Sequence, residues 1–230
     1  VVFILPSMLL YSSLGLRDNL IFCTQVLLLF SLVKRQLFFS TILLAVLAAI
    51  KIQNGLIFSF LYIGIFIFQA DRSTKALFLY CSVVLLFMIA MGDVLLATLN
   101  YFKLAFLSED KVLANIGSFV PFKSVIELIA ISPLSFVEGM VRPLPQNITS
   151  SVFLIESMIQ VAIIFWLLKS QFQKISYNPQ FLIVLFTFII GIVLNDLVIA
   201  NDFTYIRYKY TFVSLFIIYL LTYKHTPKKN

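Results

Sequence analysis

The sequence predicts an all-α fold, a polytopic bundle of membrane helices in a single domain that covers residues 1–230. Hydrophobic residues make up 61% of the 230 residues and charged residues only 12%, whereas soluble domains are typically about 45–50% apolar and about 25% charged. The apolar residues form long runs, and a helix needs roughly 20 of them to cross a bilayer. No polar linker divides these runs, so one folding unit is expected.

Eight apolar runs predict seven to eight transmembrane segments. The first run is apolar from its first residue and lacks a methionine, so we expect the chain to begin inside a helix, with more segments upstream. The third and fourth runs are short and could instead form a re-entrant hairpin, although Lys51 between them can reach the interface with its long side chain. The fifth run is the clearest, although it contains Asp93. The runs cover residues 1–11, 19–33, 36–50, 56–70, 76–99, 151–168, 181–200 and 211–223.

The basic residues predict how the bundle is oriented. If the Lys34–Arg35 loop is cytoplasmic, the short loops on that side hold nine Lys and Arg residues, against four in the short loops opposite. Positive charge collects in short cytoplasmic loops. We therefore expect a multi-pass protein of the bacterial inner membrane with a cytoplasmic C-terminus. Residues 12–18, Lys51, the long loop 100–150 and residues 201–210 are expected on the outer side.

The outer loop 100–150 is expected to carry interfacial helices. Ser108, Glu109 and Asp110 form a helix-start signal, and apolar residues follow at helical spacing. This pattern predicts an amphipathic helix at about 109–119 that caps the outer face, with Val112, Leu113, Ile116 and Phe119 on its apolar side. A second apolar helix follows and is expected to stop at Pro133.

Few residues suit metal or cofactor chemistry. Cys23 and Cys81 lie inside apolar runs and look like small apolar residues, and the single histidine, His225, is in the tail. We therefore expect no disulfide, no metal site, no cofactor and no Ser/His/Asp triad. The net charge of +7 is interpreted as membrane topology, so no nucleic-acid partner is predicted.

Three outer stretches hold the candidate binding residues. Arginine donates parallel charge-assisted bonds to a pyrophosphate, tyrosine offers a flat face to sugars, and a carboxylate could take a proton from a sugar hydroxyl. Three carboxylates inside apolar runs, Asp93, Glu156 and Asp196, are expected near the same face. Simpler interpretations remain open: a local helix-end pair, a rigid turn, and an aromatic belt with interfacial anchors. The candidates are Arg17 and Asp18, then Glu138 and Arg142, then Arg207, Tyr208 and Lys209.

The same stretches resemble a known family. "LPSMLLYSSLGLRDNLIF", "VRPLPQNITSSVFLIESMIQVAIIFWLL" and "NDFTYIRYKYTFVSLFIIYLL" are similar, in this order, to segments of bacterial O-antigen and oligosaccharide-repeat-unit polymerases and of multi-spanning lipid-linked-sugar glycosyltransferases. Leu144 and Gln146 stand where an aromatic Phe and Trp are commoner in the family.

The resemblance implies an enzyme at the outer face of the inner membrane. It would transfer a glycan from an undecaprenyl pyrophosphate carrier to a lipid-linked acceptor sugar, with membrane lipids and a chain-length regulator or other polysaccharide-assembly proteins as partners. Arg17, Arg142 and Arg207 would hold the pyrophosphate, and Asp18 or Glu138 would activate the acceptor. Two other classes remain open: a transporter or flippase for lipid-linked sugars, and a non-catalytic membrane subunit or fragment.

Overall fold

The described part of the chain is all-helical, which confirms the all-α part of the predicted fold class; the seven to eight membrane spans stay a prediction. The computed structural model describes residues 16–70, 74–109, 120–143, 148–175, 179–199 and 202–225, and no strand occurs among them. Its helices are α2 (Leu16–Val33), α3 (Leu37–Ile50), α4 (Ile52–Ala70), α5 (Thr74–Ala90), α6 (Gly92–Glu109), α7 (Val125–Val141), α8 (Ile148–Ile175), α9 (Pro179–Val198) and α10 (Asp202–His225).

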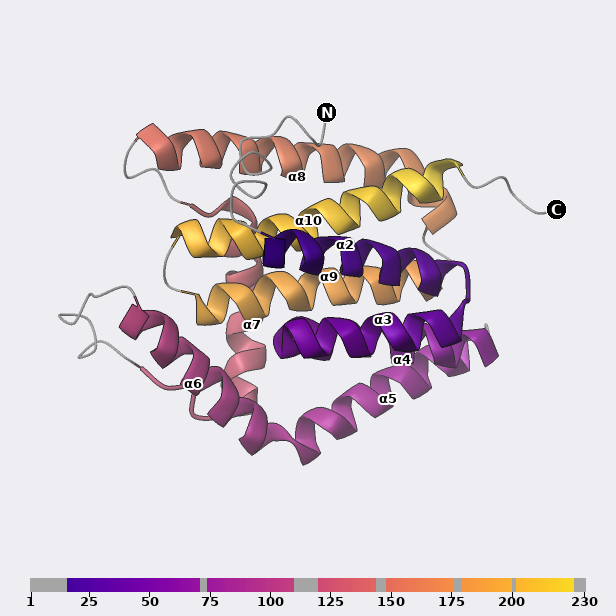
Figure 1. Ribbon diagram of the computed structural model, residues 1–230, viewed down its shortest axis with the longest axis horizontal. Coiled ribbons are helices and arrows are strands. Elements are labelled where there is room, and N and C mark those ends of the chain that lie inside the picture. The colour runs from indigo at the N-terminus through magenta and orange to yellow at the C-terminus, as the bar shows by residue number, and fades with distance from the viewer. Residues whose placement is uncertain are drawn as a thin grey trace.

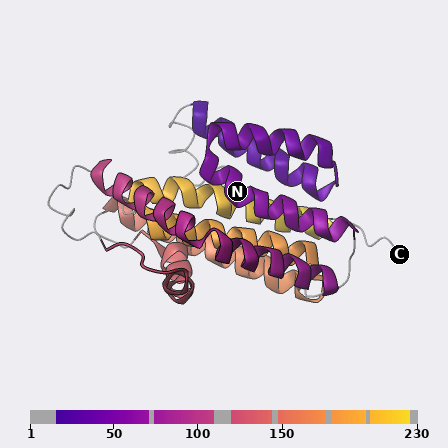
Figure 2. The same ribbon diagram turned by 90° about the horizontal axis from the view of Figure 1, so that it is seen from below.

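Helix α9 lies at the centre of the bundle. It contacts α4, α6, α7 and α10, while α10 also packs on α8 and α2. In Figure 1 the helices α2, α3, α8, α9 and α10 run alongside one another, and the successive pairs α2–α3, α8–α9 and α9–α10 run in opposite directions. Figure 2 shows α2 to α4 on one side of the α9–α10 layer and α7 on the other. Helix α7 runs across this layer, so its ends are not at the two ends of the bundle.

A tight turn joins α2 to α3. Arg35 has a φ of 61°, and the N–H of Gln36 donates to the Ser31 carbonyl at 2.9 Å, a bond pattern that closes helix C-termini. The hydroxyls of Ser31 and Ser40 then meet at 2.7 Å and tie α2 to α3. Helices α3 and α4 also approach each other closely, because Gly55 of α4 has no side chain and a Cβ there would lie 2.7 Å from Ala48 of α3.

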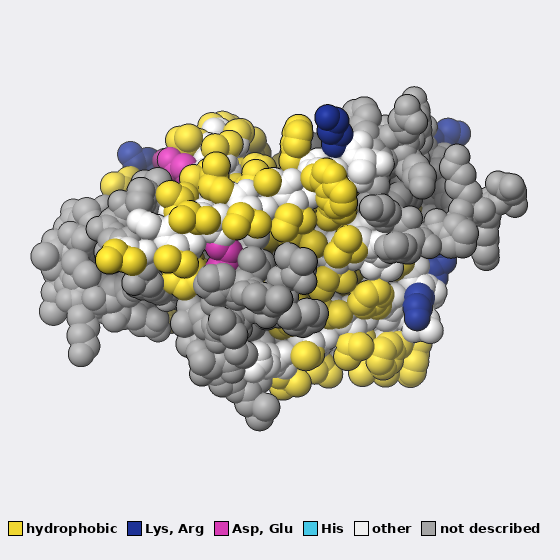
Figure 3. All heavy atoms as spheres, turned by 90° about the horizontal axis from the view of Figure 1, so that it is seen from above, with side chains coloured by type: hydrophobic (Ala, Val, Ile, Leu, Met, Phe, Trp, Pro, Cys, Tyr) yellow, Lys and Arg dark blue, Asp and Glu magenta, His cyan; other side chains and the backbone are white. Residues whose placement is uncertain are grey.

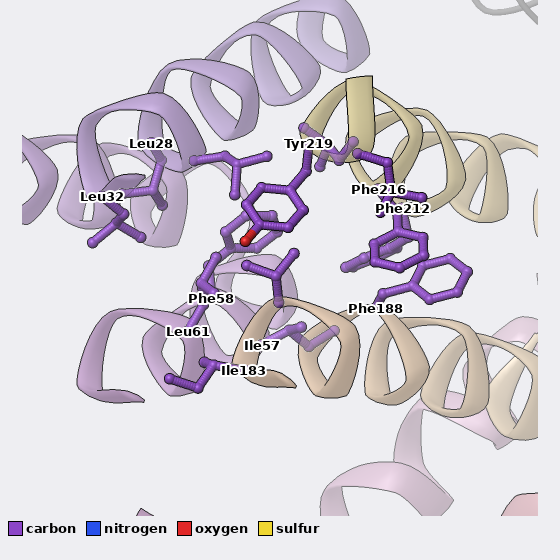
Figure 4. Close-up of a cluster of buried hydrophobic side chains, with 14 of the residues drawn as sticks. Leu28, Leu32, Ile57, Phe58, Leu61, Ile183, Phe188, Phe212, Phe216 and Tyr219 are labelled. Atoms are coloured by element: carbon purple, nitrogen blue, oxygen red, sulfur yellow. The ribbon is translucent and has the colours of Figure 1, made fainter. Parts of the chain in front are cut away.

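Aromatic rings fill the core between α9 and α10. Figure 4 shows Phe188, Phe212 and Phe216 together, with leucines of α2 and α4 nearby. The rings of Phe188 and Phe216 stack with centroids 4.4 Å apart. Large aromatic side chains bury the most apolar area per residue, so this cluster is expected to contribute strongly to the packing of the two helices.

Two helices are long and apolar enough to cross a membrane. These segments are Ser150–Ser170 and Gln180–Val198, and three shorter apolar helices cover Asp18–Val33, Leu37–Ile50 and Ile52–Phe68 within the described residues. Large apolar side chains are also exposed on several helices, including Phe38 at 83% and Phe78 at 77%. Apolar side chains dominate the described part of the face in Figure 3.

Some predicted elements require correction. The run 76–99 is not one helix, because α5 ends at Ala90 and α6 begins at Gly92. Glycine is a poor helix former and a common site of sharp bends, and Figure 1 shows a bend at this junction. Helix α6 then continues to Glu109, so Ser108 and Glu109 end a helix and do not start one.

Helix α7 continues through Pro133 to Val141, contrary to the predicted stop. The proline removes one amide donor and costs about 3 kcal/mol in a helix interior, and the packing of α7 on α9 offsets this cost. The segment 100–150, predicted to be a long outer loop, is therefore largely helical where it is described. Helix α10 also begins at Asp202, so most of 201–210 is helix. The run 1–11 and the helix predicted at 109–119, apart from Glu109, lie outside the described residues.

Candidate functional site

Four helices meet in a polar cluster that we call the α7 junction. It consists of Ser135, Gly139, Met140 and Arg142 from α7 and its C-terminal cap, Ser157 from α8, Asp196 from α9, and Tyr205 and Lys209 from α10. The junction lies where α7 crosses the layer, close to the end at which α9 finishes and α10 begins (Figure 1). In a bundle this apolar, a concentration of polar groups in one place is the first candidate for a functional site.

Lys209 closes the C-terminal end of α7. Its side chain is only 3% exposed, and its Nζ donates to the carbonyls of Met140 at 2.6 Å and Arg142 at 2.9 Å. It also donates to the Ser157 hydroxyl at 2.9 Å. The ammonium has three protons, and these three acceptors use all of them. The last carbonyls of a helix have no intrahelical partners and carry partial negative charge. Lys209 therefore gives hydrogen-bond donors to carbonyls at the C-terminal end of α7.

Arg142 is held at the edge of the junction. One guanidinium nitrogen donates to the carbonyl of Ile199 at 2.9 Å and lies 3.4 Å from a carboxylate oxygen of Asp196. The guanidinium also lies 4.9 Å from the centroid of the Tyr205 ring. Its side chain keeps 19% exposure, against 8% for Asp196. The arginine is therefore oriented by fixed partners while part of it still faces outward.

Asp196 also binds the middle of α7. Its second carboxylate oxygen accepts a hydrogen bond from the Ser135 hydroxyl at 2.7 Å. One carboxylate thus connects two positions on α7 that are two turns apart, Ser135 and Arg142. A buried carboxylate is costly unless it is paired and hydrogen-bonded, and both conditions hold here.

Tyr205 packs against a glycine at the same junction. Its ring is fully buried, and its hydroxyl donates to the Gly139 carbonyl at 2.8 Å. A Cβ at position 139 would lie 2.5 Å from the Tyr205 oxygen and 2.8 Å from a methyl of Ile192. The absence of a side chain at this position is what lets α7, α9 and α10 approach so closely.

A small hollow adjoins the junction between α8 and α10. It is lined by Phe153, Glu156, Ser157, Gln160, Ile206, Lys209 and Tyr210, and has room for about one water molecule. Gln160 donates to a carboxylate oxygen of Glu156 at 3.0 Å. The hollow can hold a small polar group, but it has no space for a whole sugar in this conformation.

The α7 junction contains two of the predicted site residues, Arg142 and Lys209. Arg142 and Lys209 meet, but Lys209 contacts the backbone carbonyl of Arg142. Glu138 is exposed on α7 one turn before Arg142, and its carbonyl accepts the Arg142 N–H. Tyr208 lies under Lys51, whose Nζ is 3.1 Å from the ring centroid.

The remaining predicted residues are only partly described. Asp18 is 7% exposed in the first turn of α2, where a carboxylate complements the helix dipole. Arg17 and Arg207 belong to the helical backbone of α2 and α10, but their side chains lie outside the described residues. The three-arginine arrangement is therefore visible only at Arg142.

Sequence reasoning assigned no binding role to Asp196, Tyr205 or Ser135. Asp196 and Glu156 did carry a signal, because each is a carboxylate within an apolar run, and both lie in or beside the junction. Asp93, the third such carboxylate, is exposed in the first turn of α6. Tyr205 belongs to the tyrosine-rich stretch 201–210 that was predicted to bind, but nothing in the sequence distinguished it from the other tyrosines there, and Ser135 gave no local signal. No group of three or more potential metal ligands occurs among the residues that the structure describes.

Comparisons with protein-family models, curated proteins and solved structures found no match to this chain.

Proposed function

We propose that the chain is a polytopic membrane glycosyltransferase of the polysaccharide-polymerase type. It transfers a glycan from an undecaprenyl pyrophosphate carrier to a lipid-linked acceptor sugar at the outer face of the bacterial inner membrane. The observation that carries this proposal is the α7 junction, where buried partners fix a partly exposed arginine at one end of an apolar helical bundle.

The arrangement of the helices supports membrane placement. The two long apolar helices α8 and α9 run alongside α2, α3 and α10, which suggests that all of them cross together. The Lys34–Arg35 turn and the C-terminal end of α10 lie toward the same end of the bundle, and the α7 junction lies toward the other (Figure 1). Basic termini and turns favour the cytoplasm, so the junction is assigned to the outer side.

In this proposal Arg142 binds the pyrophosphate of the donor. Its guanidinium is a planar fork that stays charged when partly dehydrated, and Ile199 and Asp196 hold it in one orientation. Arg17, Arg207 and Tyr208 are proposed to complete the binding site. Lys209 has a different role from the one expected, because it supports the Arg142 backbone and has no proton left for a phosphate.

Glu138 is the proposed proton acceptor, with Asp18 as the other candidate carboxylate. Glu138 is exposed one turn before Arg142, so both residues face the same region. The acceptor hydroxyl oxygen would form a bond to the anomeric carbon of the donor glycan. The bond from that carbon to the pyrophosphate oxygen would break, and the pyrophosphate would leave with the electron pair. The carboxylate would take the hydroxyl proton.

The test measures glycan transfer to a lipid-linked acceptor in membranes with matched protein levels. A charge-assisted hydrogen bond contributes about 1.5–3 kcal/mol, so Arg142→Ala and Arg142→Lys are each expected to lower the rate about ten- to a hundred-fold. Lys169→Ala is the matched control, because Lys169 is an exposed cation near the opposite end of α8. Full transfer by Arg142→Lys would contradict a forked phosphate contact.

A transporter or flippase for lipid-linked sugars is the second candidate, and one observation favours it. The apolar run that contains α5 and α6 is interrupted at Met91–Gly92, beside the exposed carboxylate of Asp93. Interrupted membrane helices with charges nearby are typical of transporters. Deleting the gene distinguishes the two functions. A polymerase predicts loss of the long glycan ladder with a surviving single-unit band, whereas a flippase predicts loss of the single unit as well.

A further inference from the structure

Helix α7 differs from its neighbours in direction and in the distribution of its side chains. It runs across α9 and α10, at the outermost side of the layer (Figures 1 and 2). The face toward α9 buries Leu128, Ser135 and Gly139. The opposite face has no packing partner from the described residues, and its large side chains are exposed: Ile126 at 79%, Ile129 at 57%, Leu134 at 60% and Val137 at 59%.

The two edges of α7 have different polarity. Glu127 and Glu138 are eleven residues apart, about three helical turns, so they share one edge. Phe136 lies on the other edge and meets the ring of Phe188 edge-on at 6.1 Å. Phe188 precedes Asp196 by eight residues, so this contact lies about 12 Å further from the C-terminal end of α9. The apolar edge therefore faces the middle of the bundle, and the acidic edge faces its end.

We propose that α7 lies in the plane of the membrane, at the boundary between headgroups and acyl chains of the outer leaflet, with lipid acyl chains covering its exposed apolar face. This inference rests on the membrane placement proposed above. A helix in such a position needs an apolar face toward lipid and a charged edge toward water, and α7 has both. The helix makes its own backbone hydrogen bonds, so lying along the boundary leaves few backbone groups without an intrahelical partner. These are the groups at the two ends and the Ile129 carbonyl, to which Pro133 has no N–H to donate.

The ends of α7 fit this position as well. At the N-terminus the Ser124 hydroxyl accepts from the Glu127 N–H at 3.1 Å, and Glu127 in turn accepts from the Lys123 N–H at 2.8 Å. At the C-terminus Lys209 satisfies the last carbonyls. Both ends of the helix are therefore closed by side chains. The inference also sets a depth for Arg142, at the level of lipid phosphates.

The experiment measures the depth of single spin labels in proteoliposomes of phosphatidylethanolamine and phosphatidylglycerol. The exposed native cysteines Cys23 and Cys81 are first replaced by alanine. Labels are then placed through Val137→Cys on the apolar face, Glu138→Cys on the acidic edge, and Phe165→Cys on α8 as the membrane reference. Accessibility to oxygen, which partitions into lipid, is compared with accessibility to a water-soluble nickel complex.

We expect the labels at 137 and 165 to be several-fold more accessible to oxygen than to nickel, and the label at 138 to show the reverse. Nickel access at 137 with oxygen access at 165 would overturn the inference alone, because α7 would then lie in water. Low access to both reagents at 137 would also overturn it, since a second copy or another protein would cover the face. Nickel access at 165 would instead refute the membrane placement on which both proposals depend.

Discussion

Replacing Lys209 by methionine tests whether the lysine is a structural cap of α7. The substitution keeps the apolar stem of a side chain that is 3% exposed but removes all three donated hydrogen bonds. The Arg142 carbonyl keeps the Ser157 hydroxyl as a donor at 3.2 Å, whereas the Met140 carbonyl loses the Lys209 donor. An acceptor left buried without a partner costs about 1–3 kcal/mol. The loss is partly offset, because dehydrating the ammonium itself costs several kcal/mol. We expect a net decrease of about 2–4 kcal/mol in the free energy of unfolding, in line with breaking other buried polar pairs.

The assay is reversible unfolding of the purified protein in detergent micelles, followed by circular dichroism. Lys51→Met is the matched control, because Lys51 is a half-buried cation that lies over the Tyr208 ring, and such a contact is worth about 0.5–1 kcal/mol near a surface. The cap interpretation requires a clearly larger loss for Lys209→Met than for the control. A Lys209→Met protein as stable as the wild type would refute it, and would reopen a binding role for this lysine.

Two further predictions concern backbone geometry. Gly139→Ala places a methyl 2.5 Å from the Tyr205 oxygen, so we expect overpacking to lower the free energy of unfolding by about 1–3 kcal/mol. Adding Tyr205→Phe in the same chain should recover part of this loss. If the effects of the two substitutions simply add in that double-mutant cycle, the clash is refuted. Arg35 has a φ of 61°, a conformation that costs a residue with a side chain about 1–2 kcal/mol. Arg35→Gly should therefore raise the midpoint of thermal unfolding in micelles. Lys34 does not have a positive φ, so Lys34→Gly should lower that midpoint or leave it unchanged.

The positions of most helices follow from local pattern. The apolar runs 19–33, 36–50, 151–168 and 181–200 correspond to α2, α3, α8 and α9 within a few residues. Such runs are readable because a helix buries its peptide groups in its own hydrogen bonds, so length and apolar content are enough to define it. The ends were less predictable, as at α10, which starts nine residues before its apolar run.

Local rules failed where packing outweighed them. Proline normally ends a helix because it lacks an amide and crowds the preceding turn. At Pro133 that local cost is smaller than the gain from laying the whole of α7 on α9. The prediction of one helix over 76–99 failed for the opposite reason, since a single flexible residue, Gly92, allowed a bend that the apolar pattern did not reveal.

The sequence by itself determined that the chain is helical and strongly apolar, and that arginines and carboxylates occur near the ends of its runs. Only the tertiary structure decided which of these groups meet. Arg142 and Asp196 are 54 residues apart, and Lys209 reaches the Met140 carbonyl across 69 residues. Such pairs depend on how helices cross, and the crossing depends on burial and close approach at positions such as Gly139. Neither the crossing of the helices nor their close approach can be predicted from a local pattern of residue types.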